Sequence, residues 1–245
     1  MTSDLNLRGR HVVVIGGSSG IGKATARSAL DAGARVTIAA RDTTRLKEAA
    51  TDLGGGVEIA TVDVTEDDQV ADVFAALGSV DHVLLSAGIP MFGPFEKLDF
   101  AQVRRYWETQ LGSLLTVARH GSAVMEAGGS LVFVTSTQNR RPAAMGALPA
   151  AVVGHGVEVI TNNLALELGQ RGVRVNSVAC GFVDTPLTRG ALGDRFAART
   201  AELARSLPIR RVVGSDDVAA LVVHLFSNAA ITGAVTAIDG GQSLQ

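Results

Sequence analysis

Features that would direct a chain to membranes, nucleic acids or oxidising compartments are scarce or absent in this sequence. The 245 residues contain one cysteine, Cys180, which excludes an internal disulfide and suits the reducing cytosol. The formal net charge of −2 gives no electrostatic reason to expect nucleic acid or an anionic membrane as partner. No apolar run approaches the roughly 20 residues of a membrane-spanning helix. Residues 1–6 are polar and unlike a signal peptide, so we expect a cytoplasmic globular protein.

Hydrophobic residues make up 47% of the chain, which is enough apolar material for a sizeable core. Strand-like and helix-like stretches alternate from end to end, and no shift in composition marks a domain boundary. Expected strands are 12–15, 35–40, 57–62, 82–85, 131–135, 173–179 and 234–238. Expected helices are one that follows a glycine-rich turn at 16–22, then 43–53, 67–77, about 100–127, 150–168, about 194–207 and 216–227. This alternation predicts one α/β domain, residues 1–245, with a parallel sheet covered by helices on both faces.

The turn after the first strand is rich in glycine and serine. Gly16, Gly20 and Gly22 lack a Cβ atom, so a pyrophosphate can approach the backbone closely. The N–H groups at the start of the following helix would point at the same place. Ser18 and Ser19 can bond phosphate or ribose oxygens, or simply stabilise the turn. A glycine cluster alone is common in tight turns, but its place between a strand and a helix favours a phosphate-binding loop.

Ligands of such folds bind beyond the carboxyl ends of the parallel strands. The candidate residues are those at the strand ends, namely 16–22, Arg41, Asp63, 86–88, Ser136 and 180–185. An acidic residue at position 41 would select the 2′-OH of NAD, whereas Arg41 suits the 2′-phosphate of NADP, so we expect NADP. The alternative is an ordinary surface arginine. Asp63 can accept a bond from the adenine amino group or cap the helix at 67–77, for which Thr65 is the expected N-cap residue.

Four segments together resemble the short-chain dehydrogenase/reductase family over nearly the full chain. Residues 15–22, Ile-Gly-Gly-Ser-Ser-Gly-Ile-Gly, are similar to its Thr-Gly-x-x-x-Gly-x-Gly cofactor loop. Residues 85–88, Leu-Ser-Ala-Gly, are similar to its Asn-Asn-Ala-Gly turn, with both asparagines replaced. Residues 174–181, Arg-Val-Asn-Ser-Val-Ala-Cys-Gly, are similar to its Arg-Val-Asn-x-Val-x-Pro-Gly segment, with Cys180 for proline. Ile-Thr-Gly at 231–233, followed by Asp239-Gly-Gly, resembles its C-terminal signature.

The resemblance implies a single Rossmann-type, doubly wound domain with seven strands. It implies that a nicotinamide dinucleotide lies across the crevice, with carboxamide contacts near Val183 and Thr185. The full set of expected cofactor contacts is Gly16, Ser18, Ser19, Gly20, Ile21, Gly22, Arg41, Asp63, Val64, Ala87, Gly88, Val183 and Thr185. It also implies a homotetramer or homodimer, built partly from the helix near Ala150 and the last strand. We expect no metal, nucleic acid or membrane partner.

The catalytic pattern of the family is incomplete in this chain. Ser136 matches the serine that holds the substrate oxygen, and Gln110 falls at the place of an asparagine that supports a water relay. The usual interval places the family's proton-donating tyrosine at Pro149 and the lysine that lowers its pKa at Val153. A shifted alignment does not restore the pair, because the single tyrosine, Tyr106, precedes the fifth strand. All three lysines, at positions 23, 47 and 97, also precede Ser136.

Other side chains can be considered as replacements. His155 titrates near neutrality, but helical geometry turns it roughly 240° from position 149 and about 200° from position 153, so it should point away. Arg140 or Arg141, on the loop after Ser136, can hold a carboxylate or belong to a solvated charged loop. Cys180 is expected as a small buried side chain. Residues 184–213 are expected to form a lid over the substrate pocket.

Two functions follow from these residues. The first is an NADP-dependent oxidoreductase with a non-standard active site, transferring hydride to or from a small carbonyl or an activated C=C bond. The alternative is a catalytically inactive dinucleotide-binding sensor or partner subunit. A lyase or isomerase on the same scaffold has no positive support in the residues. The identity of the small-molecule substrate is not encoded in any motif of the sequence.

Overall fold

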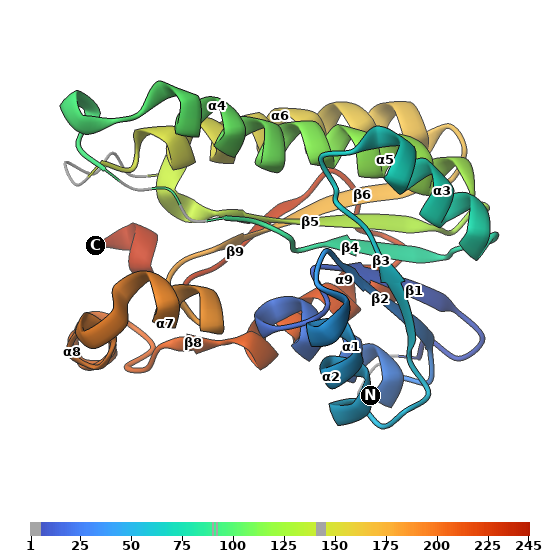
Figure 1. Cartoon of the computed structure of the whole chain (residues 1–245), viewed down its shortest axis with the longest axis horizontal. Coiled ribbons are helices and arrows are strands. Elements are labelled where there is room, and N and C mark those ends of the chain that lie inside the picture. Colours follow the sequence, from blue (N-terminus) through green and yellow to red (C-terminus); the bar gives the residue numbers. More distant parts are fainter. Residues whose placement is uncertain (1–5, 90, 92, 141–145) are drawn as a thin grey trace.

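Seven strands form one parallel sheet in the order β3-β2-β1-β4-β5-β6-β9, which confirms the sheet expected from the sequence (Figure 1). The structure is a computed structural model, and it describes residues 6–89, 91, 93–140 and 146–245. The strands of this sheet are β1 His11–Ile15, β2 Arg35–Ala40, β3 Glu58–Thr61, β4 His82–Leu85, β5 Ser130–Ser136, β6 Arg174–Cys180 and β9 Val235–Ile238. Two further short strands, β7 Val183–Asp184 and β8 Val213–Gly214, pair only with each other.

Helices cover both faces of the sheet. They are α1 Gly20–Asp31, α2 Thr43–Asp52, α3 Asp67–Leu77, α4 Phe100–Trp107, α5 Ser113–Ala123, α6 Leu148–Gly169, α7 Pro186–Leu192, α8 Phe196–Ser206 and α9 Ser215–Ser227. Figure 1 shows α3 to α6 on one side of the sheet and α1, α2 and α9 on the other. Each side has its own apolar core, centred on Phe74, Leu114 and Val157 on the first and on Leu46 and Val222 on the second.

The central strands are apolar on both faces because both faces are covered. Every residue of β1, β4 and β6 is buried, which explains the continuous β-branched run at the start of the chain. In the register, Ile15 of β1 lies opposite Ala39 of β2 and Leu85 of β4. The chain runs outward from β1 to β3 and returns on the other side at β4, so the strand order reverses between β1 and β4. The carboxyl ends of these strands therefore meet at the point where such folds bind ligands.

One long expected helix is divided. In place of a helix over about 100–127, the structure has α4, a π-helical turn at Glu108–Gly112, and α5, which ends at Ala123. The hydroxyl of Thr109 bonds back to the carbonyl of Arg105, which competes with the regular α-helical ladder in the segment where the turn widens. Val124 then leaves the helical region with φ −102°. A π-helical turn adds one residue to the turn of a helix, and this barely changes the hydrophobic period of the sequence. The sequence pattern therefore gave no sign that the helix is divided.

Two other expectations differ from the structure. The Thr65 cap is wrong: Glu66 is the N-cap residue of α3, and the hydroxyl of Thr65 donates to Asp63 Oδ1 at 2.8 Å. Helix α7 was not expected, because its short sequence carries no amphipathic period. The other expected strands and helices are found with ends that lie within 2 residues of the expected ones. Among the described residues, no helix is both long and apolar enough to cross a membrane.

Candidate functional site

The glycine loop between β1 and α1 is folded tightly against the end of β4. Gly16 has φ +88°, and a Cβ there would lie 2.6 Å from the backbone nitrogen of Ala87. A Cβ on Gly22 would collide with the carbonyl group of Gly16. The hydroxyl of Ser86 donates to the carbonyl of Ile15 at 3.1 Å and closes the same corner. The loop can therefore pack this closely against the end of β4 only because Gly16 and Gly22 have no side chain.

The start of α1 offers hydrogen-bond donors at this loop. Ser19 is the N-cap residue, with extended backbone at φ −162°, yet its exposed side chain makes no capping bond to any described residue. The first N–H groups of a helix have no acceptor within the helix, and the helix dipole makes this end positive. Ser18 and Ile21 are half-buried beside them. The arrangement is compatible with an anionic group such as a pyrophosphate.

Arg41 and Asp63 lie at the ends of the neighbouring strands β2 and β3. The Nη1 atom of Arg41 is 3.8 Å from Oδ2 of Asp63, and 61% of the Arg41 side chain is exposed. Burial acts to raise the pKa of Asp63, but bonds donated by the N–H and hydroxyl of Thr65, with the charge of Arg41, bring it below its usual value. Asp63 is thus an ionised acceptor that holds the turn before α3 rather than capping that helix. Val64 is buried in the core, so only its backbone can face a ligand.

Gln110 lies against the end of β4, next to Gly88. A Cβ on Gly88 would be 3.0 Å from Nε2 of Gln110, and this nitrogen donates to the carbonyl of Ile89 at 3.3 Å. Gln110 belongs to the π-helical turn, which is the segment where the helix changes its pitch. Burial raises the pKa of the neighbouring Tyr106, a shift that a hydrogen bond with Gln110 opposes. The single tyrosine of the chain is therefore a buried, protonated phenol on α4.

Ser136 ends β5, opposite Cys180 on β6. Its half-buried hydroxyl oxygen accepts a bond from the N–H of Gln138 at 3.3 Å, so it caps the turn at Thr137–Asn139. Burial raises the pKa of the Cys180 thiol to about 12, so this thiol stays protonated and unreactive at neutral pH. Of Ser136 and Cys180, it is Ser136 whose side chain can form a hydrogen bond with a ligand at this end of the sheet.

Helix α6 turns an apolar face inward. Pro149 and Val153 are both buried, and the indole N–H of Trp107 donates to the carbonyl of Pro149 at 3.4 Å. His155 lies on the outer face, with 66% of its side chain exposed and Nδ1 at 3.6 Å from Oε2 of Glu158. The expected outward direction of His155 is confirmed. No imidazole from this helix therefore reaches the side on which Pro149 and Val153 lie.

Of the two arginines considered for a substrate carboxylate, the structure describes Arg140. The Nη2 atom of Arg140 donates to the carbonyl of Val235 at 3.1 Å, so its guanidinium lies along strand β9. This contact favours a structural role for Arg140 over the proposed one. Arg141 lies outside the described residues. Within the described part of the chain, no group of three or more His, Cys, Asp or Glu residues is placed to hold a metal ion.

The segment that the sequence analysis expects to form a lid, residues 184–213, begins directly beside the glycine loop. Thr185 is the N-cap residue of α7, and it forms a reciprocal capping box with Thr188. A Cβ on Gly20 would be 3.4 Å from the side chain of Thr185. The pairing of β7 with β8 closes the base of the lid. Thr185 thus lies next to the loop, and the carboxamide contacts expected near Val183 and Thr185 stay a prediction. The Thr185–Thr188 capping box was missed, although its spacing is visible in the sequence.

An open pocket of about 340 Å³ lies on the outer side of α1, and it is lined in part by Lys23, Arg27 and Pro186. Its charged residues already have partners. Lys23 pairs with Asp52 at 2.6 Å, and Arg27 donates to the carbonyl of Leu53 at 3.0 Å. Of the expected site residues only Gly20 lines it. Gly88, Gln110 and Ser136 are not among the residues that line this pocket.

Comparisons with known proteins agree with this geometry. A family model described as enoyl-(acyl carrier protein) reductase matches residues 15–243. Cis-4-hydroxycyclohexanecarboxylate dehydrogenase of Sinomonas cyclohexanicum is 35% identical over 95% of this chain and 96% of its own length. A solved structure of a short-chain dehydrogenase/reductase family protein is 32% identical, covers 98% of this chain and 100% of its own, and has a TM-score of 0.86. A crystal structure of BdcA in complex with NADPH is 27% identical, with 96% and 94% coverage and a TM-score of 0.85.

Proposed function

The chain belongs to the short-chain dehydrogenase/reductase family, and we propose that it is an NADP-binding oxidoreductase with a non-standard active site. It transfers hydride to or from a small carbonyl or an activated C=C bond. The observation that carries the proposal is the backbone corner where Gly16, Gly22 and Ala87 meet the start of α1. That corner holds the loop backbone beside the first N–H groups of α1, and such N–H donors are what a dinucleotide pyrophosphate requires.

Apart from Arg41, the expected cofactor contacts divide into four groups along the crevice. The loop residues Gly16, Ser18, Ser19, Gly20, Ile21 and Gly22 hold the pyrophosphate. Asp63 and the backbone of Val64 hold the adenine, and Ala87 and Gly88 line the adjoining ribose. Val183 and Thr185 hold the carboxamide of the nicotinamide. When bound, the cofactor supplies or accepts the hydride.

NADP is proposed over NAD because of Arg41. Its guanidinium stands at the end of β2, where the adenosine ribose lies in this scheme, and it is mostly exposed. A guanidinium fork matches the two oxygens of a 2′-phosphate better than it matches a hydroxyl. BdcA, whose solved structure contains NADPH, shares the fold of this chain.

The non-standard part of the proposal concerns Pro149 and Val153. These are the positions at which the family resemblance places the tyrosine and the lysine, and neither side chain can exchange a proton. Ser136 orients the substrate oxygen by a hydrogen bond, and Gln110 orients a water. A positioned general acid contributes about 10²–10⁴-fold to a rate, so an efficient ketone reductase is not expected. An activated C=C bond suits this site better, because water can protonate the enolate that hydride addition leaves.

A specific observation also favours the second candidate function. Pro149 and Val153 are buried and apolar, and they fill space where a proton relay would have to pass. A chain that binds a dinucleotide without chemistry, as a sensor or as a partner subunit, has no use for such a relay. Binding of NADPH without turnover of any carbonyl or enone would favour this alternative.

We also propose that the protein is a cytoplasmic homodimer or homotetramer and takes neither nucleic acid nor membrane as partner. Val152, Val159 and Leu166 are exposed on α6, at a spacing of seven residues that places them along one side of the helix. Leu115 of α5 is exposed as well. Large apolar side chains aligned in this way support burial against a second copy.

The test combines binding with a substrate screen. NADPH and NADH are titrated against the protein by nucleotide fluorescence, and ketones, aldehydes and enones are then offered with the nucleotide that binds more tightly. The proposal expects tighter binding of NADPH and turnover of enones above ketones. Absence of binding by either nucleotide overturns it, and equal binding of both removes the role of Arg41.

A further inference from the structure

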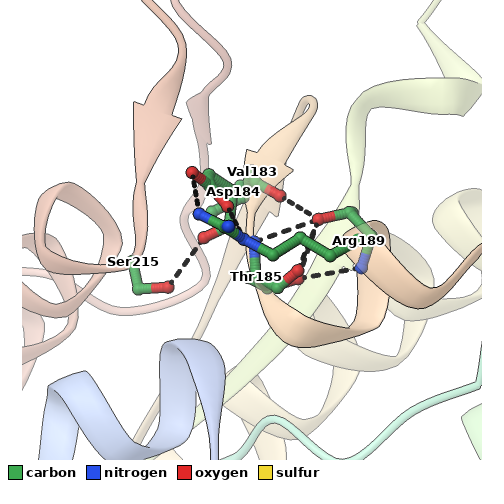
Figure 2. A network of polar contacts seen from close by, with 6 residues as sticks. Val183, Asp184, Thr185, Arg189 and Ser215 are labelled. Carbon is green, nitrogen blue, oxygen red and sulfur yellow. Dashed lines mark hydrogen bonds and ion pairs between the residues drawn. The ribbon is translucent and has the colours of Figure 1, made fainter. Parts of the chain in front are cut away.

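Arg189 forms an ion pair with defined geometry at the start of the lid. Its Nε atom donates to Oδ1 of Asp184 and its Nη2 atom to Oδ2, both at 2.8 Å, so the two planar groups face each other as a fork (Figure 2). The two residues are five apart, and the first turn of α7 brings them together. That turn is itself held by the bond from the N–H of Arg189 to the carbonyl of Thr185 at 2.9 Å.

The other side of the same guanidinium faces helix α8. Its Cζ atom lies 4.8 Å from the ring centre of Phe196, and this ring packs against Phe182 with their centres 6.0 Å apart. Arg189 therefore contacts β7 with its hydrogen-bonding edge and the first residue of α8 with its face. The structure shows no other side chain that makes both contacts among the described residues of the lid.

Asp184, the residue held by Arg189, stands between the two expected carboxamide contacts. Val183 precedes it and Thr185 follows it, and the hydroxyl of Ser215 donates to the carbonyl of Asp184 at 3.3 Å (Figure 2). Thr185 in turn touches the glycine loop at Gly20. The position of Asp184 thus fixes the strand that forms one wall of the cofactor site.

We propose that Arg189 is a positioning residue that latches α7 and α8 onto the cofactor wall through Asp184 and Phe196. The proposal rests on the proposed function, because it assigns Val183 and Thr185 to the nicotinamide end of the cofactor. The guanidinium is occupied by Asp184, so it acts through this wall and does not bind the substrate. Loss of the latch frees the lid and loosens the wall, which weakens nucleotide binding.

The chain offers a matched control. Arg199 on α8 pairs with Glu202 at 2.8 Å, and 42% of its side chain is exposed. This pair lies within one helix and bridges nothing. Arg189→Met removes the fork and keeps a long side chain over Phe196. Arg189→Lys keeps the charge without the fork. Arg199→Met is the control, because it removes an arginine of the lid that pairs only within its own helix.

Hydrogen–deuterium exchange of the full chain without nucleotide measures the latch directly. Arg189→Met should raise exchange in residues 186–206 about 5- to 30-fold, because a paired and stacked arginine is worth ~1–2 kcal/mol. Arg189→Lys should lie between it and the unchanged protein, and Arg199→Met should have no effect beyond its own helix turn. Asp184→Asn, which removes the ion pair but leaves Arg189 over Phe196, should give part of the increase, and the double variant should add little to Arg189→Met alone.

The second measurement is the dissociation constant for NADPH, followed by the separation of kcat from the KM for NADPH where turnover is found. Arg189→Met should raise the dissociation constant and the KM at least about 3-fold and leave kcat closer to its original value. Unchanged exchange overturns the latch, and raised exchange with an unchanged dissociation constant overturns its role in positioning the cofactor wall. If the unaltered protein binds no NADPH, the proposed function fails and the exchange comparison alone decides whether the latch exists.

Discussion

The proposed crevice has two halves, which depend on different kinds of chemical group. The cofactor half is made of backbone, since Gly16 and Gly22 leave no room for a Cβ and α1 directs its first N–H groups there. The catalytic half depends on side chains, of which Ser136 carries a hydroxyl while Pro149 and Val153 are buried and apolar. A backbone site survives many substitutions around it, whereas a proton path disappears when one or two side chains change. A chain of this family can therefore keep its cofactor site without its usual chemistry.

The largest effect should come from rebuilding the catalytic half. Pro149→Tyr combined with Val153→Lys should raise ketone reduction with NADPH about 10²–10⁴-fold, because it supplies a general acid and a neighbouring charge that lowers its pKa. Steady-state rates on a panel of ketones measure the gain. Pro149→Phe with Val153→Met is the matched control, since it adds similar volume without a proton. Equal rates for the two double variants would show that the missing pair does not limit the reaction.

The second prediction concerns how the stability of the protein depends on pH, and it separates this dependence from that of catalysis. Burial lowers the pKa of His82, at the start of β4, to about 4, and its Nδ1 lies 2.9 Å from Oγ of Ser130. The folded pKa lies below the unfolded value of 6.5, so the unfolded chain takes the proton first. The free energy of unfolding should therefore fall as pH drops from 6.5 to 4, by about 3 kcal/mol in total, and stay flat above 6.5.

Urea unfolding at a series of pH values measures this loss. His82→Asn keeps a polar atom near Ser130 and should remove most of the slope, although His11, whose pKa burial also lowers, leaves a smaller slope of the same sign. The turnover rate should not change between pH 6.5 and pH 9 through the ionisation of a catalytic group. The described residues of the catalytic half include no group that is expected to titrate in this pH range. A slope that persists unchanged in His82→Asn would refute the assignment.

The sequence was informative where one short pattern decides the structure. Strands 35–40 and 82–85 and helix 67–77 match the structure end for end, because apolar residues fill them and turn residues bound them. The glycine loop was recognisable since its residues act through their lack of a side chain. Contacts between separate elements could not be recognised in the sequence. No spacing or composition indicates, for example, that Arg189 contacts both Asp184 and Phe196. The π-helical turn at Gln110 is hidden for a similar reason, as its helix keeps one hydrophobic face throughout.

The third prediction tests the backbone nature of the cofactor half. In Gly22→Ala the added methyl group meets the carbonyl of Gly16, which is backbone and cannot rotate away. Such overpacking costs typically 1–3 kcal/mol, and we expect NADPH to bind about 5- to 100-fold more weakly. Gly169→Ala is the matched control, because a Cβ at this last residue of α6 meets nothing within 4 Å. Titration by nucleotide fluorescence, with melting temperatures for both variants, distinguishes lost binding from lost folding.

The smallest effect is expected at the adenosine end, where the cofactor half changes from backbone to side chain. Arg41→Ala should weaken NADPH about tenfold and leave NADH nearly unchanged, because a guanidinium–phosphate contact at an exposed position is worth ~1–2 kcal/mol. Arg41→Lys should keep part of the preference, since it retains the charge without the fork. The carboxylate nearest to Arg41 is that of Asp63. Breaking this ion pair does not itself favour the binding of either nucleotide. The ratio of the dissociation constants for NADPH and NADH therefore measures the phosphate contact alone. A ratio that stays the same in Arg41→Ala would place the selection of NADP elsewhere in the crevice, and the side-chain end of the cofactor half would then tolerate a substitution that its backbone end, at Gly22, does not.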